Sequence, residues 1–161
     1  MEQFEPRWVT EGRKHIGLQE LIGVENNPVI VQFWKDIKRG GIKDDKTPWC
    51  AAFAGAMLER TGIRSTRFES AKSYLSWGDK LDAPVPGCIV VFTRKGGGHV
   101  GFVVGKRPNG DLLVLGGNQG DAVNIRAFGT DRVTGYRWPA GEPVNTASLP
   151  TGEAATSTSE A

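Results

Sequence analysis

The stretch TPWCAAFAGAMLERTG, residues 47–62, decides the fold, because it has the pattern of a buried helix with a cysteine in its first turn. Thr47 followed by Pro48 is typical of a helix start, and Gly62 stands where such a helix would end. The apolar residues recur at the spacing that defines one face of an α-helix: Trp49, Ala52, Phe53, Ala56 and Met57. We therefore predict a helix with Thr47 as its N-cap that packs this face into a core.

Cys50 allows two interpretations. As the third residue of a helix capped by Thr47, it lies among amides that lack intrahelical partners, where the helix dipole stabilises a thiolate. A free cysteine is also among the most buried residue types, and position alone favours a packed core residue. The choice between a nucleophile and a core residue depends on whether the rest of the chain places a catalytic partner beside Cys50.

His99 is the candidate partner of Cys50. It opens the segment HVGFVVG, whose alternation places His99, Gly101 and Gly105 on one face of a predicted strand. Glycines beside an imidazole leave room for a substrate or for another backbone. A strand-end histidine in solvent is the commoner case, and solvent exposure is our interpretation of His15.

The register of a predicted hairpin supplies a third candidate. With a turn at residues 109–110, Gly101 faces Asn118, and cross-strand partners share a face. Asn118 then lies diagonal to His99, at roughly 7–8 Å between backbones. The register favours Asn118 over Gln119 as the residue that orients the imidazole, and a one-residue slip would reverse this choice.

A thiol, an imidazole and a side-chain amide are the parts of a cysteine nucleophile system. The histidine takes the thiol proton and later protonates the leaving amine, while the amide carbonyl holds the ring in its useful tautomer. The backbone N–H of Cys50 can donate to the oxyanion of the tetrahedral intermediate. Thr47 and Asp45 are candidates for a second donor because they lie just upstream.

The rest of the chain predicts an α+β fold with helices first and one small antiparallel sheet after them. Helical patterns cover residues 6–17, 26–41, 47–62 and 70–77, and β-branched runs cover 88–93, 99–105, 111–117, 121–128 and 133–138. We expect one catalytic domain over residues 1–140. Residues 141–161 are small and polar, which predicts a disordered tail.

Charge and composition exclude several classes of protein. The net charge of +2 arises from 20 basic and 18 acidic residues spread along the chain, without the clustered basic face of a nucleic-acid-binding protein. No apolar run is long enough to span a bilayer, and the N-terminus lacks the apolar core of a secretory signal. The two cysteines, Cys50 and Cys88, are too few for a disulfide framework, and we interpret Cys88 as a packed strand residue.

Four blocks carry a resemblance to a known family: PWCAAF, GHVGFVVG, LGGNQGDAVNI and GYRWP, in this order and up to Pro139. Together they resemble the papain-like cysteine amidases and peptidases of the CHAP and NlpC type, in particular a small phage and bacterial group. The resemblance implies a papain-like fold, with a cysteine-bearing helix packed on an antiparallel sheet that carries a histidine. It also implies that Cys50 is the nucleophile, His99 the base and Asn118 the third residue.

Two departures from this family matter. Many CHAP domains have a glutamate two residues before the asparagine, where this chain has Gly116. Some CHAP endolysins bind calcium through an aspartate-rich loop, but residues 44–45 supply too few acids for such a site. We therefore expect no metal and no cofactor.

The resemblance implies an endolysin-like peptidoglycan hydrolase, either an N-acetylmuramoyl-L-alanine amidase or a stem-peptide endopeptidase. We expect a monomer that is made in the cytoplasm, does not insert into membranes, and reaches the periplasm or cell wall through a holin, a phage tail or a secretion machine. The alternatives are a papain-like hydrolase or acyltransferase acting on a protein or small amide, and a non-catalytic wall-binding module. Tyr74 and Trp77 are candidate substrate-groove residues, as is Trp49, for which core packing is the favoured interpretation.

Overall fold

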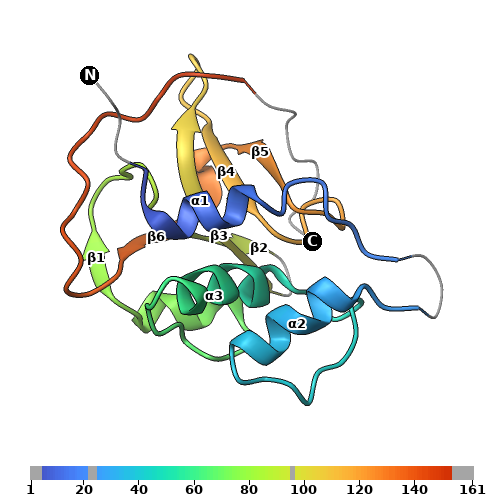
Figure 1. Ribbon diagram of the computed structural model, residues 1–161. Coiled ribbons are helices and arrows are strands. Elements are labelled where there is room, and N and C mark those ends of the chain that lie inside the picture. The colour runs from blue at the N-terminus through green and yellow to red at the C-terminus, as the bar shows by residue number, and fades with distance from the viewer. Residues whose placement is uncertain (1–4, 22–24, 95–96, 154–161) are drawn as a thin grey trace.

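The computed structural model describes residues 5–21, 25–94 and 97–153 and shows helices packed on an antiparallel sheet (Figure 1). The helices are α1 (Arg7–Arg13), α2 (Pro28–Asp36) and α3 (Cys50–Arg60), with short 3-10 helices η1 (Ala71–Ser76) and η2 (Thr130–Arg132). The strands are β1 (Asp79–Leu81), β2 (Ile89–Arg94), β3 (Gly97–Lys106), β4 (Leu112–Gly116), β5 (Asn124–Phe128) and β6 (Val133–Trp138). They form one sheet in the order β1-β6-β2-β3-β4-β5. The predicted α+β class is confirmed.

Two of the predicted helix starts are confirmed by their capping contacts. The side chain of Asn27 accepts the N–H of Val29 at 2.9 Å, and Pro28 occupies the first position of α2. The side chain of Ser70 accepts the N–H of Lys72 in the same way at the start of η1. Both side chains satisfy amides that the helix itself leaves without acceptors.

The start of α3 differs from the prediction, because Thr47 is not its N-cap. The carboxylate of Asp44 accepts the N–H of Lys46 at 3.0 Å and that of Thr47 at 2.7 Å, so these amides belong to a turn before the helix. Trp49, with φ −116° and ψ 19°, is the N-cap. Cys50 is therefore the first helical residue instead of the third, although it still lies in the first turn.

Helix α3 is the centre of the core. Its residues from Cys50 to Leu58 are all buried, on every face and not only on the predicted apolar face. Phe53 makes ring contacts on two sides, with Phe33 of α2 at 5.7 Å and Phe102 of β3 at 6.4 Å between ring centroids. Figure 1 shows α2 beside α3, with the sheet on the other side of α3.

The turn between β3 and β4 is longer than predicted. The N–H of Arg107 donates to the carbonyl of Asp111 at 2.8 Å, which leaves a loop of residues 108–110 instead of a two-residue turn. Gly110 has φ +97°, as the last position of such a three-residue hairpin loop requires. The longer loop shifts the register by one residue.

A bulge shifts the same register again. Lys106 pairs with Leu112, but Phe102 pairs with Leu115, and the shift falls between Val103 and Gly105. A bulge places an extra residue in one strand and so moves the pairing beyond it by one position. The predicted pairing of Gly101 with Asn118 is therefore wrong, and β4 ends at Gly116 before it reaches Asn118.

Residues 150–152 bond to the end of β3, within a segment for which the sequence predicted a disordered tail from residue 141. The N–H of Lys106 donates to the carbonyl of Pro150 at 2.8 Å, and the N–H of Gly152 donates to the carbonyl of Lys106 at 2.9 Å. Backbone hydrogen bonds at the end of β3 order this segment. Such bonds do not depend on the side chains, so the polar composition of the segment could not predict them. Residues 154–161 lie outside the described residues.

Candidate active site

Cys50 is positioned by the turn that precedes α3. Its side chain is buried except for 6% of its surface, and its sulfur is not in a disulfide. The first hydrogen bond of the helix runs from the N–H of Phe53 to the carbonyl of Trp49 at 2.9 Å. The amide of Cys50 itself therefore precedes the intrahelical ladder and is one of the donors that a helix N-terminus presents to an anion.

Cys88 contrasts with Cys50. It is fully buried just before β2, and its sulfur is likewise not in a disulfide. Burial raises the pKa of the Cys88 thiol to about 12. The interpretation of Cys88 as a packed residue is confirmed, and its thiol stays protonated at neutral pH.

His99 is fully buried on β3, and its Nε2 lies 2.9 Å from Oε1 of Gln119. The other end of the Gln119 carboxamide donates to the carbonyl and to Oδ1 of Asn124, at 3.0 and 2.9 Å. Both of these partners are acceptors, so the nitrogen of the carboxamide faces Asn124 and its oxygen faces His99. His99 therefore carries its proton on Nε2, and Nδ1 is the basic nitrogen of the ring.

Gln119, not Asn118, thus makes the contact with His99 that the sequence assigned to Asn118. β4 ends at Gly116, so Asn118 lies beyond the ladder. Asn118 adopts φ +59°, which turns the chain and presents the next side chain, that of Gln119, to His99.

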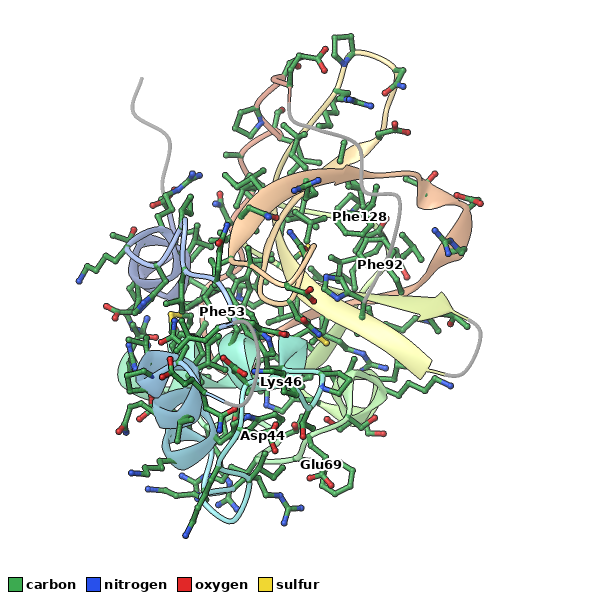
Figure 2. All side chains as sticks on the ribbon, turned by 90° about the vertical axis from the view of Figure 1, so that its right-hand side faces the viewer. Asp44, Lys46, Phe53, Glu69, Phe92 and Phe128 are labelled. Carbon is green, nitrogen blue, oxygen red and sulfur yellow. The ribbon has the colours of Figure 1, made fainter. Side chains whose placement is uncertain are left out.

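Two phenylalanines that the sequence analysis missed hold the plane of the imidazole. Phe128 lies 5.5 Å from His99 between ring centroids, with 21° between the planes, and Phe92 stacks on Phe128 at 4.7 Å. Phe92 also faces His99 in the β2–β3 register. Figure 2 shows Phe92 and Phe128 together on the sheet, away from Phe53 among the helices. A β2–β3 register would have found Phe92, whereas no local pattern points to Phe128.

Gly116 and Gly117 lie between His99 and the first turn of α3. A Cβ at Gly116 would come within 2.3 Å of Oε1 of Gln119 and 3.3 Å of Nε2 of His99. A Cβ at Gly117 would come within 2.6 Å of Phe53 in the first turn of α3 and 2.7 Å of the ring of Trp49, its N-cap. The carboxamide of Gln119 thus fills the space that a side chain at residue 116 would need.

We expect Gly117→Ala to lower the thermal unfolding midpoint by ~3–10 °C, because the added methyl group overpacks the contact with Phe53 and Trp49. Circular dichroism melting curves measure this change. Gly41→Ala is the matched control, because a Cβ at Gly41 would meet no atom within 4 Å. Equal midpoints for the two variants would show that the chain has space at Gly117.

The three candidate groove residues have different surroundings. Trp49 and Tyr74 are fully buried, so neither offers a surface to a substrate, and Trp49 donates its indole N–H to Glu20 at 2.8 Å. Core packing, the favoured interpretation of Trp49, is confirmed, and it holds for Tyr74 as well. Trp77 is half-buried and lines a hollow with Arg64, whose carbonyl accepts its indole N–H.

Neither Asp45 nor Thr47, the two candidates for a second oxyanion donor, has a free hydrogen-bond donor in this structure. Asp45 is fully buried, and burial raises the pKa of its carboxyl, but Lys46 and the N–H groups of Leu21 and Asn27 outweigh that effect and lower the pKa overall. Asp45 is therefore a carboxylate, which accepts hydrogen bonds and cannot donate them. The hydroxyl and the N–H of Thr47 both bond to Asp44.

Within residues 5–21, 25–94 and 97–153, no helix is long and apolar enough to cross a membrane. In the same ranges, no cluster of three or more His, Cys, Asp or Glu side chains could hold a metal ion.

The comparison with protein families supports the resemblance seen in the sequence. Residues 42–118 match the family model of the CHAP domain, a range that includes Cys50, His99 and Asn118 and ends one residue before Gln119. A CHAP domain implies hydrolase activity on peptidoglycan, of the amidase or peptidase type. The search of curated proteins finds no match.

Proposed function

We propose, on the premise that residues 42–118 are a CHAP domain, that this protein cleaves an amide bond of bacterial cell-wall peptide through an acyl-enzyme on Cys50. One observation carries the proposal beyond the family: Gln119 holds His99 with its proton on Nε2. A ring in this tautomer can act as a base through Nδ1 and needs no rearrangement before it accepts a proton.

In the proposed mechanism, Nδ1 of His99 takes the thiol proton while Sγ of Cys50 attacks the carbonyl carbon of the substrate amide. The N–H of Cys50 donates to the oxyanion that forms. The tetrahedral intermediate collapses, the C–N bond breaks, and the leaving amine takes the proton from His99. Water then gives a proton to His99 and attacks the thioester, which releases a carboxylic acid and restores the thiol.

Gln119 and the two phenylalanines act through His99 as positioning residues. When Nδ1 gains a proton, the N–H at Nε2 continues to donate to Gln119, whose carbonyl oxygen stabilises the imidazolium. Phe92 and Phe128 limit rotation of the ring. The ring therefore returns to the same orientation after each proton transfer.

The same chemistry serves an amidase that cuts between muramic acid and alanine and an endopeptidase that cuts within the stem peptide. Purified sacculi incubated with the protein distinguish the two by mass spectrometry of the new termini. An amidase frees the amino group of the first alanine, and an endopeptidase creates an amino terminus further along the peptide. Protein alkylated with iodoacetamide is the control.

Intact sacculi after incubation with the unmodified protein would contradict the proposal. Intact sacculi together with thiol-dependent cleavage of a protein or a small amide would favour the general papain-like hydrolase. Binding to sacculi without any new termini would favour the non-catalytic wall-binding module.

A further inference from the structure

We infer that Asn118 is a substrate-binding residue whose side-chain oxygen accepts a hydrogen bond from a peptide N–H of the substrate. The inference rests on the proposed function and deepens it. It replaces the sequence-based role of Asn118 as the residue that orients His99, which the structure gives to Gln119.

The first observation is a buried acceptor without a donor. Asn118 is 95% buried, since its exposed fraction is 5%, and its Oδ1 is sealed from solvent. Among the residues that the structure describes, none donates a hydrogen bond to this oxygen. A buried carbonyl oxygen without a donor is costly, so such an oxygen in a native structure calls for an explanation.

The second observation is the backbone that holds Asn118. Its φ of +59° lies in the left-handed region, as do those of Gly120 at +64° and Asp121 at +63°. The N–H of Gln119 donates to the carbonyl of Ala122 at 2.9 Å, which closes this loop. The backbone at Asn118 is therefore fixed by this loop, and residues held in the left-handed region cluster at active sites and ligand clamps.

The third observation is the place of Asn118 between the two halves of the active site. The residue before it, Gly117, packs against Trp49 and Phe53 on either side of Cys50. The residue after it, Gln119, bonds to His99. Asn118 therefore lies between a residue that packs on the start of α3 and a residue that bonds to His99.

The chemistry of the oxygen decides which substrate group it binds. A carboxamide oxygen only accepts, so its partner is a donor, and a peptide next to the scissile carbonyl offers its N–H groups. A site built to bond a substrate N–H discriminates against a substrate that lacks it, because the buried oxygen is then left unpaired. We therefore assign to Asn118 the recognition of a peptide N–H beside the cleaved bond.

Kinetics on soluble muropeptides, released from sacculi by a glycan-cutting muramidase, test the assignment. Asn118→Gly removes the carboxamide and keeps the positive φ without strain, and Asn118→Asp keeps an acceptor oxygen. We expect Asn118→Gly to raise KM about tenfold or more, with the pH profile of kcat unchanged, and Asn118→Asp to recover most of the loss. The exposed turn residue Asn109, changed to Gly, is the matched control.

A direct binding measurement completes the test. In ¹⁵N-labelled Cys50→Ala protein, the side-chain NH₂ resonances of Asn118 should shift when muropeptides are added, and those of Asn109 should not. A residue with only a structural role would give no such shift. The muropeptides remain uncleaved because the nucleophile is absent.

Each other outcome overturns the inference. An unchanged KM for Asn118→Gly would show that the carboxamide does not bind substrate. A lower kcat with a shifted pH profile and an unchanged KM would show that Asn118 acts through His99. If the wild-type protein cleaves neither sacculi nor muropeptides, the proposed function is wrong and the inference falls with it, whereas the first two outcomes leave the proposed function intact.

Discussion

Cys50→Ala should release no new termini from sacculi, with a rate reduced by about 10⁴-fold or more. The substitution removes the only atom that forms the thioester in the proposed mechanism, while a methyl group remains to fill the first turn of α3. Mass spectrometry of muropeptides over time measures the loss. Melting curves of the variant should match those of the wild type, because Cys50 makes no disulfide.

Cys88→Ala is the matched control, and it should keep most of the activity. Iodoacetamide at neutral pH should modify Cys50 and not Cys88, because full burial raises the pKa of the Cys88 thiol to about 12. Equal rates for the wild type and Cys50→Ala would contradict the thiol mechanism. Alkylation of Cys88 in preference to Cys50 would contradict the assignment of the nucleophile.

Gln119→Ala has the second largest expected effect, a fall in kcat of about 100-fold or more with a small change in KM. Without the acceptor at 2.9 Å, neither the tautomer nor the orientation of His99 is fixed, and the imidazolium loses its stabilising oxygen. Initial rates on muropeptides give both constants. The variant also leaves Oδ1 of Asn124 without the carboxamide N–H of Gln119, so rates are compared at a temperature where circular dichroism shows both proteins folded.

The matched control for this variant is Gln32→Ala on the exposed face of α2, where the glutamine only bonds to Asp36. We expect wild-type rates from it. The kinetic pattern separates Gln119 from its neighbour, since Gln119 should affect kcat and Asn118 should affect KM. A larger fall in kcat for Asn118→Gly than for Gln119→Ala would return the orienting role to Asn118.

The sequence predicted the elements of this fold better than the way they meet. Local signals located α2, α3, η1 and the strands β2 to β6, because caps, apolar spacing and β-branched runs act over a few residues. The short strand β1 was not predicted. The start of α3 was missed because the carboxylate of Asp44 holds the amides of Lys46 and Thr47 in a separate turn. A helix start predicted from Thr47 and Pro48 does not take into account that the Asp44 carboxylate binds the amides just before the helix.

The residue that contacts His99 differs from the predicted one because the ladder does not reach residue 118. The choice of Asn118 depended on an unbroken ladder from a two-residue turn. The three-residue loop and the bulge after Val103 each shift the pairing by one position, and two such shifts leave the face of a residue unchanged. β4 instead ends at Gly116, and the left-handed turn at Asn118 brings Gln119 to His99. Phe128 was beyond local reasoning, because it lies on β5, two strands away from His99 in the sheet.

Asn124 begins β5, which is the outermost strand on its side of the sheet, and it sets the orientation of Gln119. The location of one proton on an imidazole in β3 therefore depends on a strand two places away in the sheet. If β5 frays at this end, Gln119 loses the contact that orients its carboxamide, and Nδ1 of His99 is no longer held as the basic nitrogen. Cys50 and the imidazole ring would keep their positions. The edge strand of the sheet thus controls which nitrogen of His99 carries the proton. The free energy of local unfolding at β5 should therefore correlate with kcat more closely than the free energy of local unfolding at α3.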